Sequence, residues 1–113
     1  MGIDHEYPNI VKQALTSYAS LLAQFPNPSY EIILAFDDER HQYLLRKLGW
    51  TENSRLRQTV LHVAIRNGKI WIEEDWTEEG IATYFISHNV PRENIVLGFQ
   101  PRIMRPYTEF AVD

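Results

Sequence analysis

The sequence predicts one α+β domain, in which a long N-terminal helix and a second, shorter helix accompany a mainly antiparallel sheet of about four to five strands. Three observations carry this prediction. An apolar helical period lies near the N-terminus, several β-branched and aromatic runs follow it, and Asn67-Gly68 is a strong hairpin signal. Because 113 residues suit one hydrophobic core, we take residues 1–113 as a single domain.

Residues 10–25 carry the apolar pattern of an amphipathic helix. Pro8 fits the opening turn of this helix, and Asp4 and Glu6 suit the positive end of its dipole. The prolines that follow residue 25 end it. The apolar stripe comprises Ile10, Val11, Ala14, Leu15, Tyr18, Leu21, Leu22 and Phe25.

Two strands are expected after this helix. Residues 30–36 are rich in β-branched and aromatic side chains, and Asp37-Asp38 is typical of the turn that ends such a strand. Residues 40–50 predict the second strand, with a weaker alternation that is compatible with a bulge.

The dipeptide Asn67-Gly68 predicts a hairpin, because a type I′ turn requires positive φ at both central positions. It joins a strand over residues 55–66 to a strand that begins at Lys69. The register follows from the turn and pairs Arg66 with Lys69, Ile65 with Ile70, Ala64 with Trp71, Val63 with Ile72 and His62 with Glu73.

This register also divides the side chains between two faces of the sheet. We expect a helix to cover the face that carries Leu61, Val63, Ile65, Ile70 and Ile72. The opposite face carries His62, Ala64, Trp71 and Glu73.

Residues 80–86 predict a short helix that ends near Asn89. Asp75 or Thr77 suits its cap, and Asp75 with Glu78 resembles a capping box. Residues 95–99 then predict a strand. The prolines at 101 and 106 predict an extended tail that continues to residue 112.

The amino-acid composition and net charge exclude several classes of function. The chain has no cysteine, which excludes disulfides, thiolate metal ligands and a thiol nucleophile. It has no apolar run long enough to span a membrane and no signal-peptide pattern, so we expect a cytoplasmic protein without a membrane partner. A net charge of −4 removes the overall positive charge of most nucleic-acid binders.

One segment of the chain is rich in basic residues despite the negative net charge. Its side chains could contact a DNA backbone, although strand alternation does not require them to share a face, and a solvated surface is the competing interpretation. The candidate DNA contacts are Arg46, Lys47, Arg55, Arg57, Arg66 and Lys69.

The tryptophans near these charges suggest a protein interface, because tryptophan and arginine concentrate binding energy. The candidate interface comprises Trp50, Trp71, Trp76, Glu73 and Glu74.

Catalytic chemistry finds little support. The four histidines lack metal-ligand spacing, and the predicted pairing of His62 with Glu73 is more typical of a sheet surface than of a dyad. We therefore predict no catalytic, metal-binding or cofactor-binding residue and no cofactor. The enzyme alternative is a metal-dependent nuclease or hydrolase that uses Asp37, Asp38, Glu73 and Asp75, with His62 as a further member.

The motifs from the second strand onward resemble the XisI family, whose members are known as fdxN element excision controlling factors. Two positions depart from the family pattern, Trp76 and Asn89, where glycine is expected. The resemblance rests on residues 68–72, 75–82, 90–99 and 105–112, together with Tyr43, Gly49-Trp50 and residues 60–62.

The resemblance implies a cyanobacterial accessory protein that acts during heterocyst development. With a companion called XisH, such a factor is needed when a site-specific recombinase excises a DNA element. The recombinase performs the strand chemistry, so the expected mode of action is protein contact with a XisH-like partner, with the recombinase complex and DNA reached indirectly. A homodimer is a further expectation. Direct DNA binding is the alternative.

Overall fold

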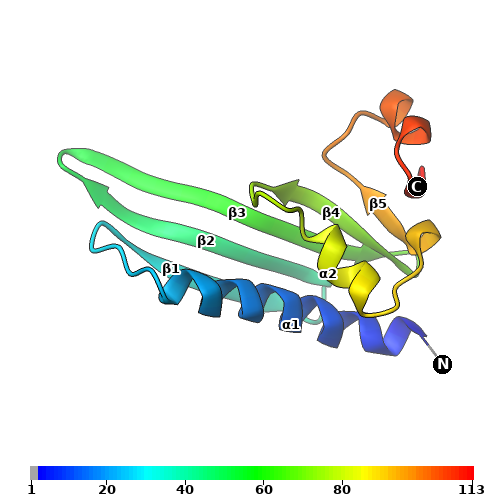
Figure 1. The fold of residues 1–113 in the computed structure, drawn as a ribbon, viewed down its shortest axis with the longest axis horizontal. Coiled ribbons are helices and arrows are strands. Elements are labelled where there is room, and N and C mark those ends of the chain that lie inside the picture. Colours follow the sequence, from blue (N-terminus) through cyan, green and yellow to red (C-terminus); the bar gives the residue numbers. More distant parts are fainter. Residues whose placement is uncertain (1–2) are drawn as a thin grey trace.

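The computed structural model describes the backbone of residues 3–113 and the side chains from residue 6 onward. It contains one five-stranded sheet in the order β1-β2-β3-β4-β5, with α1 and α2 on the same side of it (Figure 1). This arrangement confirms the predicted α+β class. The elements are α1 (Ile3–Ala23), β1 (Tyr30–Asp37), β2 (Gln42–Thr51), β3 (Ser54–Arg66), β4 (Lys69–Asp75), α2 (Ala82–Ser87), η1 (Arg92–Asn94), β5 (Ile95–Leu97) and η2 (Arg102–Tyr107).

Helix α1 begins earlier than the sequence predicts. Pro8 therefore lies inside the helix, past its first turn, and not in the opening turn. Tyr7 accounts for the extension, because it is 1% exposed in the core and its hydroxyl accepts a hydrogen bond from the Asn94 side-chain amide at 2.9 Å. The predicted dipole role of Asp4 falls outside the described side chains. Phe25 lies beyond the helix end and is exposed.

Strands β1, β2 and β3 form an antiparallel meander, as the apolar runs predict. The Asp37 carboxylate accepts backbone hydrogen bonds from Glu39 and Arg40 at 3.0 Å each, which confirms the turn after β1. The expected bulge is present between β2 and β3, where the pairing shifts next to Leu45. Val60 is the inserted residue, and it is buried in the core.

The β3–β4 hairpin confirms the Asn67-Gly68 prediction, with φ of 53° and 73° at the two residues. Four of the five predicted pairs are present. The fifth is wrong: His62 pairs with Glu74, because Glu73 is inserted as a second bulge after the Val63–Ile72 pair. A bulge of this kind has no local sequence signal and depends on what surrounds the strand.

A helical crossover through α2 makes β5 parallel to β4. The predicted capping box is wrong, since Ile81 occupies the cap position of α2 without a side-chain hydrogen bond. Asp75 instead holds the connection from further upstream. Its carboxylate accepts hydrogen bonds from the Thr77 amide and hydroxyl, at 2.9 and 2.6 Å, and from the Ile81 amide at 2.7 Å.

The C-terminal tail is not extended throughout, as its prolines had suggested. Residues 102–107 form η2, and the chain then returns to β5 through a parallel bridge between Val96 and Ala111. The Arg105 guanidinium closes this loop by donating hydrogen bonds to the carbonyls of Gly98, Gln100 and Val112. These partners are five or seven residues away from Arg105 in the chain, and no apolar periodicity signals such contacts, so the sequence does not predict this closure.

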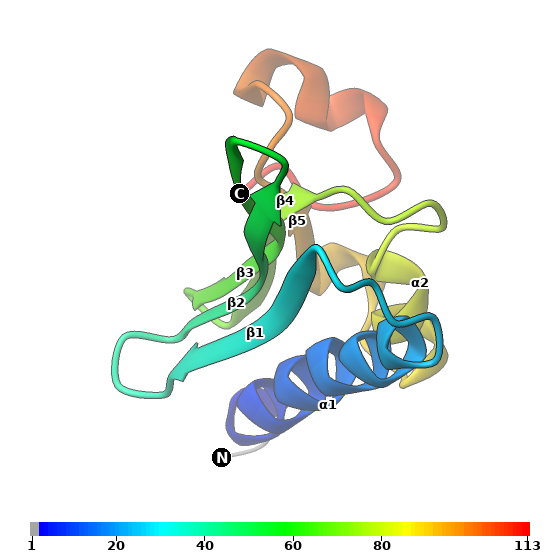
Figure 2. The same ribbon diagram turned by 90° about the vertical axis from the view of Figure 1, so that its left-hand side faces the viewer.

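The hydrophobic core lies between the sheet and the two helices, on the face that was predicted to receive a helix. A second, smaller cluster forms on the opposite face near β4 and β5, from Ala64, Trp71 and Val96 with Ala111 against them. Figure 2 shows α1 and α2 on one side of the sheet and the tail folding back near β4 and β5. The main core comprises Tyr7, Val11, Ala14, Leu15, Tyr43, Leu45, Val60, Leu61, Val63, Ile65, Ile70, Ile72, Ile81, Phe85, Val90 and Ile95.

Candidate interaction surfaces

The side of the sheet that faces away from α1, over residues 31–35, 44–50 and 55–62 of β1, β2 and β3, is called the open face. Within residues 3–113, no helix or strand packs against it (Figure 2). The alternation of each strand and the pairing between strands assign its side chains. Its cross-strand rows are Trp50–Arg55, Glu31–Leu48–Arg57, Ile33–Arg46–Thr59 and Ala35–Leu44–His62.

Three of the candidate DNA-contact residues occupy consecutive rows of the open face: Arg46, Arg55 and Arg57, called the distal arginine cluster. Arg55 and Arg57 are exposed, and the Arg55 guanidinium lies 5.3 Å from the centre of the Trp50 ring. Arg46 is partly buried, and its Nε has no hydrogen-bond partner among the described residues. A buried unpaired donor is costly, so the folded chain leaves this cluster incompletely satisfied.

The other three candidate DNA contacts are separated from this cluster. Lys47 lies on the opposite side of the sheet, where its ammonium is 4.8 Å from the centre of the Tyr30 ring. Arg66 and Lys69 do point to the same side as the cluster, but they lie at the β3–β4 turn. Nine residues along β3 place Arg66 about 30 Å from Arg57. The six residues therefore do not form one continuous patch.

Trp71 is buried by the protein itself and is 8% exposed. The guanidiniums of Arg66 and Arg105 lie 4.0 and 5.3 Å from the centre of its ring, and Glu73 pairs with Arg66 at 2.8 Å. These cation–π contacts tie the hairpin and the tail to one aromatic side chain. Trp71 and Glu73 are thus held by contacts within the chain, whereas the sequence predicts them as part of an outward interface.

The motif around Gly98 also has a structural reason. A Cβ at this position would lie 2.8 Å from the Glu73 Oε1 and 3.3 Å from the Ile72 carbonyl oxygen. A glycine therefore lets the segment after β5 pass close to β4.

Trp50 and Trp76 remain available for contact, with 57% and 67% of their surfaces exposed. They lie in different places, because Trp50 belongs to the open face and Trp76 follows β4 beside α2. The Trp76 indole N–H donates to the Glu74 carboxylate at 2.7 Å, so Glu74 holds this ring in position. The two predicted interface tryptophans that remain exposed therefore lie on two separate surfaces.

The carboxylates of the enzyme alternative do not converge. Asp37 is at the end of β1, in the row that leads through Gln42 and Ala64 to Trp71 on β4. Three strand spacings separate it from β4 by about 14 Å, far more than the distance between two ligands of one metal ion. No group of three histidine, aspartate or glutamate side chains among the described residues is arranged to hold a metal. His62 instead contacts the Gln42 side chain at 2.8 Å.

Asp38 belongs to a polar cluster on the helix side of the sheet edge. The Lys12 ammonium and the Tyr43 hydroxyl donate hydrogen bonds to its carboxylate at 2.7 and 2.8 Å. These bonds, led by the one from Lys12, hold the pKa of Asp38 below its usual value. Burial and the Asp38 carboxylate raise the pKa of Tyr43. The cluster fixes α1 against the β1–β2 turn, and its carboxylate is already paired.

A groove lies between α1 and the segment that connects β4 to α2. It has a volume of about 630 Å³ and includes Leu21, Trp76 and Tyr84 in its lining. No sequence pattern predicts this groove, because α1 and residues 76–87 are far apart in the chain and only the fold brings them together. None of the helices within residues 3–113 is long and apolar enough to cross a membrane.

Known proteins share both the sequence pattern and this fold. The family described as XisI protein matches residues 1–112. A crystal structure of a XisI-like protein from Anabaena variabilis ATCC 29413 is 35% identical, over 98% of this chain and 100% of that one, with a TM-score of 0.90. A second structure from the same organism, called fdxN element excision controlling factor XisI, is 33% identical over 97% and 98%, with a TM-score of 0.87. No curated protein matches the chain.

Proposed function

Since this chain belongs to the XisI family, we propose that it is an accessory factor that controls excision of a DNA element by a site-specific recombinase. A relative that covers nearly the whole chain carries the name of an excision controlling factor, which supports this role. The proposed mode of action is contact with a XisH-like protein. A factor of this kind needs a binding surface, since the recombinase performs the strand chemistry.

The exposure and composition of the open face are the observations that support this proposal. It presents the exposed Trp50 and partly exposed Leu44 and Leu48 beside the distal arginine cluster. Apolar and aromatic side chains with interspersed arginine are the composition of protein interfaces. Folding leaves this surface uncovered within residues 3–113, and a bound partner would bury it.

Co-purification with the neighbouring XisH-like protein tests this proposal. We expect a tagged chain to retain the partner and Leu48→Glu to lose it, because a carboxylate would enter the apolar part of the open face. Gln58→Glu is the matched control. It adds the same charge one strand away, on the helix side of the sheet, where Gln58 pairs with Lys47.

Two results would count against the proposed contact. One is the absence of association when both proteins are folded, and the other is equal loss in the two variants. Light scattering of the isolated chain measures whether a second copy occupies the open face, as the expected homodimer requires. A dimer that Leu48→Glu dissociates would assign this face to self-association.

Direct DNA binding is the second candidate, and the single face shared by Arg46, Arg55 and Arg57 favours it. Phosphate contacts release counterions, so the logarithm of affinity falls with the logarithm of salt concentration. Each lost contact makes this dependence less steep by about 0.9. Arg55→Gln with Arg57→Gln should therefore reduce the slope by about 1.8 in a gel-shift titration. Lys47→Gln with Arg102→Gln removes the same charge elsewhere and should leave it unchanged. A salt dependence that is unchanged in Arg55→Gln with Arg57→Gln would exclude this surface as a DNA contact.

A further inference from the structure

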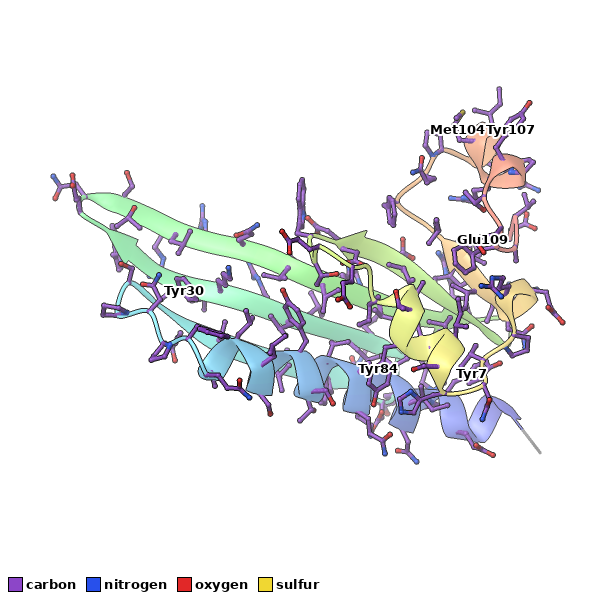
Figure 3. All side chains as sticks on the ribbon, in the orientation of Figure 1. Tyr7, Tyr30, Tyr84, Met104, Tyr107 and Glu109 are labelled. Carbon is purple, nitrogen blue, oxygen red and sulfur yellow. The ribbon has the colours of Figure 1, made fainter. Side chains whose placement is uncertain are left out.

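The groove between α1 and α2 is separate from the open face and lies on the other side of the sheet. One wall comes from α1, through Ser17, Tyr18 and Leu21, and the other from residues 76–87. Tyr84 projects from α2 toward α1 at this place (Figure 3). Leu61 and Ile81, which are buried, form the inner part of the lining.

Large apolar side chains at the groove remain exposed after folding. Leu21 is 48% exposed and Trp76 is 67% exposed. Leu21 belongs to the apolar stripe of α1, so the stripe extends beyond the part of the helix that the sheet covers. A groove with exposed apolar side chains on two walls suits an apolar face of another chain.

The second wall is held in place before any partner arrives. The Asp75 carboxylate fixes the amides of Thr77 and Ile81, and the Thr77 hydroxyl accepts from the Gly80 amide at 3.1 Å. The bond from the Trp76 indole to Glu74 fixes the exposed ring. Because these groups are already ordered, binding in the groove has a low entropic cost for this wall.

The charges around the groove have one sign. Glu78 and Glu79 line it, both are exposed, and neither forms an ion pair among the described residues. Among the residues that the structure describes, no lysine or arginine contributes to its lining. Burial raises the pKa of Tyr18, and the charges of Asp75 and Glu78 add to this effect. Lys12 lines a neighbouring hollow together with Ser17 and Tyr84, and its ammonium is engaged by Asp38 at 2.7 Å.

We propose that this groove binds a basic amphipathic helix of a partner protein. The apolar face of such a helix would cover Leu21 and Trp76, and its lysines or arginines would flank Glu78 and Glu79. Charge complementarity selects this occupant over an acidic or neutral one. The inference does not depend on the excision role, because it uses none of the open-face residues.

A synthetic peptide tests the inference. The probe is a helix of about 14 residues with leucines on one face and lysines on the other, labelled for fluorescence polarisation. We expect saturable binding to the full chain. Trp76→Ala should weaken it about tenfold, since an aromatic anchor is lost, and Trp50→Ala should not change it.

The charge requirement has its own matched pair. Glu78→Gln with Glu79→Gln should weaken binding about fivefold. Glu52→Gln with Glu93→Gln changes the net charge equally at exposed positions outside the groove and should have no effect. The corresponding leucine–glutamate peptide should not bind.

Three results would overturn the inference: equal affinity in Trp76→Ala and Trp50→Ala, equal affinity in the two glutamate pairs, or equal binding of the acidic peptide. Amide chemical shifts of the labelled protein provide a second measurement, which should change along α1 and residues 76–87 and not along β1 and β2. A dimer of the isolated chain that Trp76→Ala dissociates would assign the groove to a second copy, which also overturns it.

Discussion

The two faces of the sheet are made by the same strands but depend on different partners. On β2, Tyr43 and Leu45 point toward α1 and are fully buried, whereas Leu44 and Leu48 point to the open face and remain partly exposed. Packing within the chain explains the first set. The second set is apolar without being covered, so it marks the part of the sequence that folding alone does not explain.

The side of the sheet that faces away from α1 has two different parts. Near β4 and β5 the tail and Arg105 cover Trp71, while near β2 and β3 Trp50 is exposed. An aromatic residue on a strand therefore does not indicate an interface by itself. What matters is whether another segment of the same chain returns to cover it.

Replacement of Trp71 and of Trp50 should show the largest difference in stability between these two regions. Trp71→Ala removes a buried ring that two guanidiniums contact, and we expect it to lower the free energy of unfolding by about 3–5 kcal/mol. Trp50→Ala should change it by less than about 1 kcal/mol, because the ring is exposed. Urea denaturation of both variants measures the difference, and equal losses would contradict the division.

Leu45 and Leu48 compare the two faces with one residue type on one strand. Leu45→Ala should lower the free energy of unfolding by about 2–5 kcal/mol, because the residue is 0% exposed and a cavity would form in the core. Leu48→Ala should cost about 1 kcal/mol or less. A larger loss for Leu48 in chemical denaturation would mean that the open face is covered in the isolated protein.

Asp75 links the hairpin to α2, so its replacement tests how the groove wall is held. Asp75→Ala leaves the Ile81 amide without its acceptor and should cost about 1–3 kcal/mol. The exposed Glu79 is the control, and Glu79→Ala should have little effect on thermal unfolding. Similar melting temperatures for the two variants would argue that Asp75 does not fix this wall.

The smallest expected effect concerns Tyr43, whose contribution to stability should be lost at alkaline pH. Its pKa is raised in the folded protein, so its contribution is complete below the unfolded pKa of about 10 and is lost as the pH rises through the higher folded value. Tyr43→Phe should cost about 1 kcal/mol at neutral pH through the lost bond to Asp38. The variant should also lose less stability than the parent protein between neutral pH and pH values above about 10. Parallel pH profiles would contradict the assignment to Tyr43.

Local sequence determined the elements and most of their pairing. The apolar period of α1, the β-branched runs and the positive φ required at Asn67 and Gly68 are properties of neighbouring residues, which is why they could be read without a structure. The motifs also identified the family, and two solved relatives share the fold.

Only the tertiary structure decided which of these side chains meet. The bulge at Glu73, the return of Arg105 onto Trp71 and the groove between α1 and α2 join residues from separate segments, and pattern within one segment does not encode such contacts. The candidate surfaces changed for the same reason. The sequence by itself determined that tryptophans and arginines accompany the strands, whereas the packing of the tail and helices decided that Trp71 is covered and that Trp50 and Trp76 are exposed.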